Sequence, residues 1–234
     1  MVIEYDGADF CGWQYQPNAR TVQGEIEHAL KRLTSENIRV IGAGRTDQGV
    51  HALGQVANFH TSSAFGLTEI HKALNSLTGD DIYIKQVSKV DDDFHSRYSA
   101  KSKIYQYNIV FWPSPFKLPH NWYVKYTLDL SRMGKAKGYL VGKHDFKYFS
   151  AESDKDNTFC MVHSISLTEQ DSRIIIHIQG DRFLRRMVRG IVGCLHDVGR
   201  GHYKPEQAQD VLNGRLRDLF FAPAHGLFLV EVKY

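Results

Sequence analysis

The order of apolar and polar residues along the chain predicts short strands that alternate with amphipathic helices. Between Val22 and Leu33 the apolar residues share one stripe at helical spacing, and Thr21 is placed to cap that helix. The strongest helical pattern runs from Phe183 to Val198. The other expected helices are 67–77, 129–141 and a short one opening at Lys204-Pro205-Glu206, and the expected strands are 1–5, 38–43, 55–61, 82–90, 104–111, 163–170, 173–179 and 227–234.

These elements indicate an α+β fold, a mixed α/β arrangement with a largely antiparallel sheet covered by helices on one side. The order strand, loop, helix, strand, loop, strand occurs once in each half of the chain, although no clear sequence repeat accompanies it. We therefore expect an N-terminal half over residues 1–98 and a C-terminal half over residues 99–234.

Composition excludes several classes of protein. With 42% hydrophobic and 24% charged residues, the chain is not expected to be disordered. Its apolar runs are too short to cross a membrane, and its first residues lack the pattern of a secretory signal. The three cysteines lie far apart and the twelve histidines show no metal-ligand spacing. We expect no disulfide framework, no metal site and a cytoplasmic location.

The loop from Gly44 to His51 is the first candidate for chemistry. Its glycines permit an unusual backbone path between two expected strands. Asp47 on such a loop can act as a nucleophile or general base, and Arg45 can bind a phosphate or fill a gap in a base stack. The alternative is a simple turn in which the Asp47 side chain caps its own backbone. Residue types alone leave both interpretations open.

Positive charge is clustered rather than general. The 29 basic and 26 acidic residues give a net charge of +3, too small by itself to indicate a nucleic-acid partner. Arg182, Arg185, Arg186 and Arg189 nevertheless lie within eight residues on the strongest expected helix. They can bind phosphates or form a solvated helix face. Arg189 adjoins the apolar stripe, so it can point inward and then needs a carboxylate partner.

Aromatic and basic residues are also interleaved near the middle of the chain. Tyr98, Tyr105 and Tyr107 are interleaved with Arg97, Lys101 and Lys103. This combination suits base stacking with phosphate contacts, whereas aromatics at alternate positions also pack an ordinary sheet face. Trp13 is either a core anchor or a substrate contact, and the pair His144-Asp145 is expected to be structural. The motifs of P-loop, dinucleotide-binding and serine hydrolase folds are absent.

Taken together, these segments resemble the tRNA pseudouridine synthases of the TruA type. The resemblance covers nearly the whole chain, and the segment Gly44-Arg45-Thr46-Asp47-Gln48-Gly49-Val50-His51-Ala52 is highly specific to that family. The other matching segments, in order, are Ile3–Gly7, Gly12–Gln14, Thr21–Gly24, Gly54–Val56, Phe94–Ala100, Tyr105–Tyr107, Gly142–Phe146, Phe183–Gly193 and Ala222–Leu227.

The resemblance implies an isomerase that converts uridine to pseudouridine in the anticodon stem-loop of tRNA. It implies two related halves around a shared sheet with an RNA-binding cleft, a homodimer, and no cofactor or metal. By the same resemblance Asp47 is the catalytic aspartate, Arg45 replaces the flipped base, Tyr105 stacks on the uracil and Arg189 pairs with the aspartate. We add Arg97, Lys103, Arg185 and Arg186 as expected RNA contacts.

The chain departs from the family pattern at two places. Lys103 stands where arginine is more usual, and Asn157–Ser164 lacks the usual arginine. Both changes bear on RNA affinity more than on catalysis. Two other functions compete with this one. A catalytically silent RNA-binding protein has no need of Asp47, and a glycoside-cleaving hydrolase usually needs a second carboxylate beside it.

Overall fold

A computed structural model describes residues 1–151 and 157–234, which form two compact units. Unit 1 contains Met1–Lys101 and Phe228–Tyr234, and unit 2 contains Ser102–Leu227. The last strand is therefore grouped with the N-terminal residues, although the order of elements along the chain led us to place it in the C-terminal half. No helix among the described residues is long and apolar enough to cross a membrane.

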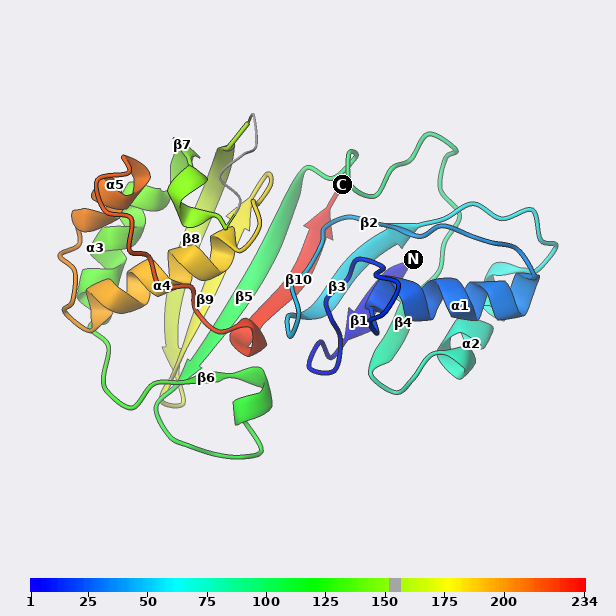
Figure 1. The fold of residues 1–234 in the computed structure, drawn as a ribbon, viewed down its shortest axis with the longest axis horizontal. Coiled ribbons are helices and arrows are strands. Elements are labelled where there is room, and N and C mark those ends of the chain that lie inside the picture. The colour runs from blue at the N-terminus through cyan, green and yellow to red at the C-terminus, as the bar shows by residue number, and fades with distance from the viewer. Residues whose placement is uncertain (152–156) are drawn as a thin grey trace. The chain divides into compact units, whose positions relative to one another are not determined.

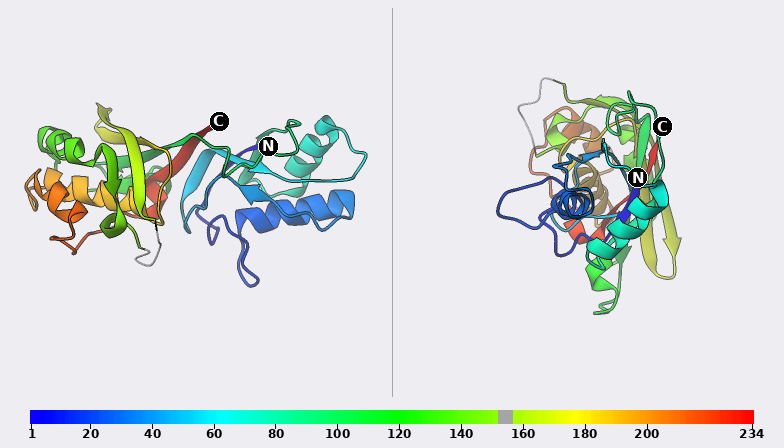
Figure 2. Two further views of the ribbon diagram at one scale, coloured as in Figure 1. Left: turned by 90° about the horizontal axis from the view of Figure 1, so that it is seen from above. Right: turned by 90° about the vertical axis from the view of Figure 1, so that its right-hand side faces the viewer.

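In unit 1 the strands follow the order β4-β1-β3-β10, and β2 pairs with the far part of β3 (Figure 1). The β3–β10 pair is parallel and the other pairs are antiparallel. The strands are β1 (Val2–Tyr5), β2 (Ile41–Gly42), β3 (His51–Asn58), β4 (Ile82–Gln86) and β10 (Leu227–Lys233). Two helices, α1 (Val22–Thr34) and α2 (Leu67–Leu77), pack against each other (Figure 2).

In unit 2 the strands follow the order β5-β9-β8-β7, all antiparallel, with β6 parallel to the end of β5. The strands are β5 (Ser102–Val110), β6 (Trp122–Tyr123), β7 (Gly142–Asp145), β8 (Phe159–Gln170) and β9 (Arg173–Gly180). The helices are α3 (Leu130–Leu140), α4 (Met187–Gly199) and α5 (Gln207–Leu212). The fold class expected from the sequence is confirmed.

Local signals account for the elements that the sequence located well. The Thr21 hydroxyl accepts the Gly24 N–H at 3.3 Å, and the Asp129 carboxylate likewise caps α3 at the Arg132 N–H. The β8–β9 turn places Asp171 and Ser172 at positive φ, as a two-residue hairpin turn requires. Both caps and the hairpin turn thus depend on interactions among a few neighbouring residues.

Other boundaries were wrong, and the structure gives the reason for two of them. The expected strand over residues 38–43 is reduced to two residues, because the Val40 N–H and carbonyl bind the side chains of Glu27 and Gln23. The expected helix from Phe183 begins only at Met187, after Arg186 in the left-handed conformation with φ 60°. The strands expected over 55–61 and 82–90 end earlier, at Asn58 and Gln86.

Candidate active site

The loop that carries Asp47 follows β2 in unit 1, and its backbone is held by hydrogen bonds from several sides. The Trp13 N–H donates to the Thr46 carbonyl at 3.1 Å, and the Gln55 side chain donates to the Gly44 carbonyl at 2.8 Å. Within the loop, the Val50 N–H donates to the Asp47 carbonyl at 3.2 Å. These bonds fix the backbone on both sides of Asp47, which is the condition for a precisely placed carboxylate.

Two buried side chains support the same loop from below. The Tyr5 hydroxyl lies 2.8 Å from the Thr46 hydroxyl, and burial raises the pKa of Tyr5 well above its usual value. The Trp13 indole is only 2% exposed and packs against Gly42, at the entrance to the loop. Trp13 is therefore a packing anchor of the Asp47 loop, one of the two roles expected for it.

Arg45 and Asp47 flank the buried Thr46 and are themselves more accessible. Arg45 is exposed and Asp47 is half-buried. Gly49 takes the positive φ of 76° that closes the turn after Asp47, whereas Gly44 does not need a positive φ. The loop thus presents a guanidinium and a carboxylate two residues apart, with the residue between them turned into the protein.

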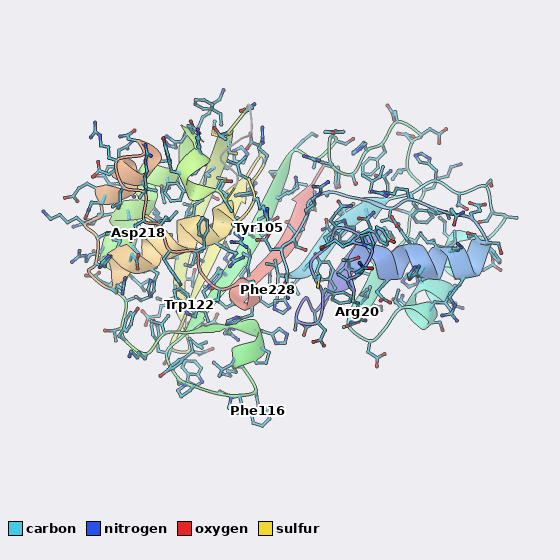
Figure 3. The ribbon with its side chains drawn as sticks, viewed as in Figure 1. Arg20, Tyr105, Phe116, Trp122, Asp218 and Phe228 are labelled. Carbon is cyan, nitrogen blue, oxygen red and sulfur yellow. The ribbon has the colours of Figure 1, made fainter. Side chains whose placement is uncertain are left out.

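Tyr105 belongs to unit 2, on β5 opposite Ile178 of β9 (Figure 3). Its side chain is 7% exposed and its ring meets the edge of Phe183 at a centroid distance of 5.1 Å. Tyr107, two residues on, is fully buried, and its hydroxyl donates to the Pro223 carbonyl at 2.8 Å. The packing interpretation therefore holds for Tyr107, whose hydroxyl is fixed by the segment after α5.

Arg189 is the only residue of α4 that is not buried. Its Nε donates to the Ala222 carbonyl at 2.7 Å, and the Ala222 N–H donates back to the Arg189 carbonyl at 3.1 Å. Burial raises the pKa of Tyr107 well above its usual value, and the positive charge of Arg189 partly opposes this. Burial lowers the pKa of His225, a backbone hydrogen bond at Asn121 opposes the shift, and the Arg189 charge favours it. Arg189 is therefore anchored to the Ala222 backbone and lies near Tyr107 and His225.

The arginine cluster is not arranged as the sequence suggested. Of its four members only Arg189 lies within α4, because the preceding residues form the loop after β9. The Arg182 guanidinium donates to the Asn157 carbonyl at 3.1 Å, while Arg185 and Arg186 are exposed. Arg186 is the residue at the left-handed corner just before the helix. Arg182, Arg185, Arg186 and Arg189 therefore do not share one helix face.

The remaining expected RNA contacts differ in exposure. Arg97 of unit 1 is exposed, with its guanidinium carbon 5.6 Å from the centre of the Tyr98 ring, which is itself 76% exposed. Lys103 lies on β5 opposite Gly180 and is only 8% exposed. His144 and Asp145 bind neighbouring backbone groups of Val141 and Lys147, as their structural interpretation predicted.

Sequence reasoning missed Gln23. This side chain is 2% exposed, and it accepts the Tyr15 N–H and donates to the Glu27 carboxylate and the Val40 carbonyl. The available signal was its position in the motif Thr21–Gly24, on the buried side of an amphipathic helix, where a polar residue needs partners.

Comparison with known proteins identifies the family of this chain. The sequence matches the tRNA pseudouridine synthase family over residues 1–99 and 136–234. The chain belongs to that family. Both Asp47 and Arg189 fall inside the matched stretches, whereas Tyr105 falls between them. The enzymes of the family are isomerases that convert uridine to pseudouridine.

Full-length relatives show the same relationship. Proteins named tRNA pseudouridine synthase A from Thermoanaerobacter sp. (strain X514) and Acetivibrio thermocellus are 42% and 44% identical to this chain. Each alignment covers 100% of this chain and 98% of the relative. The Bacillus cereus protein named tRNA pseudouridine synthase A 1 is 42% identical over 99% of this chain and 96% of its own length. The pseudouridine synthase resemblance is therefore confirmed over the whole chain.

Proposed function

We propose that this pseudouridine synthase acts on uridines in the anticodon stem-loop of tRNA, at positions about 38 to 40, after the target base has left its stack. The observation that carries the proposal is the Asp47 loop, with Arg45 exposed, Asp47 half-buried and Thr46 between them held by Trp13 and Tyr5. A loop that served only as a turn would not need that support from distant residues.

The reaction breaks the bond from N1 of uracil to C1′ of the ribose and forms a bond from C5 to C1′. Asp47 acts in one of two ways. Its carboxylate either attacks C1′ and forms a transient ester, or removes the C2′ proton so that the freed uracil departs. After the uracil has turned, C5 bonds to C1′, the C5 proton is lost and N1 gains a proton. In the first route the ester C1′–O bond breaks as C5 bonds to C1′, and in the second the protonated Asp47 returns its proton to C2′. Either route regenerates the carboxylate, and no net oxidation or reduction occurs.

The other residues are assigned complementary roles. Arg45 has a planar group that can stack in the space left by the flipped base. Tyr105 offers the face or edge of a ring on which the freed uracil can turn. Arg189 is assigned to pair with the Asp47 carboxylate through its positive charge.

The RNA outside the reacting uridine requires phosphate contacts. Arg97, Arg185 and Arg186 are exposed and suit this role, whereas Lys103 is buried and suits a contact close to Tyr105 on the same strand. We include in the proposal that the enzyme acts as a homodimer in the cytoplasm and needs no cofactor or metal.

Replacement of Asp47 by Asn tests the assignment. We expect Asp47→Asn to abolish tritium release from tRNA labelled at uracil C5, with tRNA binding in a gel-shift assay nearly unchanged. Asp92→Asn, at an exposed aspartate, is the matched control and should retain full release. Turnover by Asp47→Asn at the wild-type rate would contradict the role given to Asp47.

The target positions need a separate substrate series. Transcripts that carry uridine at a single position of the anticodon stem-loop, and otherwise identical transcripts with uridine only elsewhere, should differ in tritium release. Release confined to positions 38, 39 or 40 supports the anticodon stem-loop assignment. Release only from uridines elsewhere contradicts it and leaves the isomerase activity intact. Binding without release from any uridine favours a catalytically silent RNA-binding protein instead.

A further inference from the structure

A groove of about 300 Å³ lies beside α1 in unit 1, and none of the residues assigned to catalysis lines it. This volume is at the lower end for small-ligand pockets, about 300–1,000 Å³, so the groove has room for one planar ring and its substituents. Its lining comes from three segments of the chain, namely Tyr15, the helix residues Gly24, Glu27, His28 and Lys31, and the extended residues Asn37, Ile38 and Arg39.

Helical spacing builds one wall of this groove. The four α1 residues that line it are separated by three, one and three positions, so they lie on one face of the helix. Gly24 lies at the floor, where a methyl group would approach the Thr21 hydroxyl oxygen to 2.9 Å and would be in ordinary contact with the Tyr15 ring. A methyl group at Gly24 would lie 3.4 Å from the ring carbon Cδ2 of Tyr15. Tyr15 is 43% exposed, so one side of the ring remains available.

The buried Gln23 holds the three walls together. Its carbonyl oxygen accepts the Tyr15 N–H at 3.0 Å, and its amide nitrogen donates to the Glu27 carboxylate at 2.7 Å. The same amide nitrogen donates to the Val40 carbonyl at 3.1 Å. One side chain therefore fixes the loop, the helix and the extended segment, so the groove is formed before any ligand binds.

The charge that lines the groove is mainly positive. Lys31, Arg39 and His28 are all exposed, and Glu27 is the one acidic group among the lining residues. One oxygen of Glu27 already accepts hydrogen bonds from Gln23 and from the Val40 N–H at 2.9 Å. A ligand thus meets an aromatic ring beside two permanent cations, and a carboxylate oxygen that can accept from a base amino or imino group.

We propose that this groove binds one nucleotide of the RNA substrate, with its base stacked on Tyr15 and its phosphate bound by Lys31 and Arg39. The inference rests on the proposed action on tRNA. An aromatic ring flanked by cations is the combination that binds unpaired nucleotides without strong sequence preference. An acidic peptide would satisfy the two cations and leave the ring face without a partner of matching shape.

The groove is connected to the catalytic loop through a short rigid segment. Tyr15 follows Trp13 by two residues, and the Trp13 N–H binds the Thr46 carbonyl at 3.1 Å. The Gln23 N–H in turn binds the Trp13 carbonyl at 3.0 Å. A nucleotide on Tyr15 is thereby held at a constant distance from Asp47, which would help to place the target uridine.

The test measures Kd for tRNA by filter binding and KM by tritium release. We expect Tyr15→Ala to raise both by about tenfold and Tyr15→Phe, which keeps the ring, to restore most of the binding. Removing both cations, Lys31→Ala with Arg39→Ala, should reduce the slope of log Kd against log salt by about 1 to 2. Tyr83→Ala, at a 54% exposed tyrosine of β4, and Lys72→Ala, at an exposed lysine of α2, are the matched controls.

Three outcomes would overturn the groove assignment. One is a Kd for Tyr15→Ala equal to that of Tyr83→Ala, with an unchanged salt slope for the double variant. Another is a change in the oligomeric state of Tyr15→Ala by light scattering, which would make the groove a contact between copies of this chain. The third is unchanged tRNA affinity with lost affinity for an acidic peptide. If Tyr15→Ala destabilises the fold and so lowers the unfolding midpoint, the groove assignment is judged instead from the slope of log Kd against log salt for Lys31→Ala with Arg39→Ala.

Failure of the proposed function gives a different experimental result from failure of the groove assignment. Wild-type protein that binds tRNA but releases no tritium from any uridine contradicts the proposed reaction, whereas the Kd series still tests the groove. If the wild-type protein turns over tRNA and Tyr15→Ala leaves the Kd unchanged, only the groove assignment is contradicted.

Discussion

Arg189 and Ala222 bind each other through two hydrogen bonds. The Arg189 Nε donates to the Ala222 carbonyl at 2.7 Å, and the Ala222 N–H donates to the Arg189 carbonyl at 3.1 Å. One bond uses the side chain of Arg189 and the other its backbone, so the guanidinium is oriented by the segment that precedes the short turn at Ala224–Gly226 and β10. This orientation requires the Nε–H, which a lysine lacks.

Arg189→Lys is therefore expected to behave as a damaging change. The charge remains, but the Nε hydrogen bond to Ala222 is lost and the cation is no longer directed. We expect kcat to fall by about 100-fold or more, a loss typical of a removed electrostatic group in an active site. Tritium release at saturating tRNA measures it. Arg215→Lys, at an arginine that is 75% exposed, is the control and should keep kcat. A wild-type kcat for Arg189→Lys would show that its orientation is unimportant.

Gly193 of α4 has no room for a side chain. A methyl group there would overlap the Phe220 carbonyl oxygen and lie 2.8 Å from its carbon, and both atoms belong to the backbone. We expect Gly193→Ala to lower the free energy of unfolding by about 1–3 kcal/mol, as overpacking does. Gly138→Ala is the matched control in α3, where nothing lies within 4 Å, and should stabilise by about 0.5–1 kcal/mol. Urea denaturation of both variants measures these opposite effects, and equal stabilities would contradict the close approach.

The lowered pKa of Asp197 gives a prediction for how the free energy of unfolding depends on pH. Burial raises the pKa of this carboxyl, but the hydrogen bond from His196 and the charge of Arg200 outweigh burial and lower it overall. The folded-state pKa lies below the unfolded value of about 3.9, so the stabilisation is complete above that value. It is lost as the pH falls through the folded-state pKa.

The measurement is the urea midpoint between pH 7 and pH 3. Asp197→Asn should be less stable than wild type at pH 7 and should lose less of its stability on acidification. Asp92→Asn, at an exposed position, controls for the removal of one acidic group. A parallel loss of stability in Asp197→Asn and wild type below pH 4 would show that another carboxyl is responsible.

Arg185 and Arg186 are expected to bind phosphates. Both are exposed at the loop before α4, although they do not share a helix face with Arg189. Replacing both by Ala should weaken tRNA binding and reduce the slope of log Kd against log salt by about 2, one for each lost phosphate contact. Arg215→Ala with Arg217→Ala removes two other exposed arginines and serves as the control. An unchanged slope would mean that Arg185 and Arg186 only face solvent.

Local sequence determined much of this molecule. The helix α1 has the cap expected for it, α3 is capped by the neighbouring Asp129, α2 has its expected bounds, and the β8–β9 turn follows from two residues at positive φ. In each case the deciding interactions join residues within a few positions of one another. The Asp47 loop was found for a different reason, since its motif is specific to the pseudouridine synthase family.

Only the tertiary structure decided the rest, because the deciding contacts join residues far apart in the chain. The Asp181 carboxylate binds the N–H groups of Met161 and Arg182, and the chain reaches α4 through a loop instead of starting the helix at Phe183. The Gln23 side chain binds the Val40 carbonyl and the Tyr15 N–H, so the strand expected over residues 38–43 does not form at Val40. Alternation could not distinguish Tyr105 from Tyr107 either, since both face the same side of β5 and differ only in what packs against them.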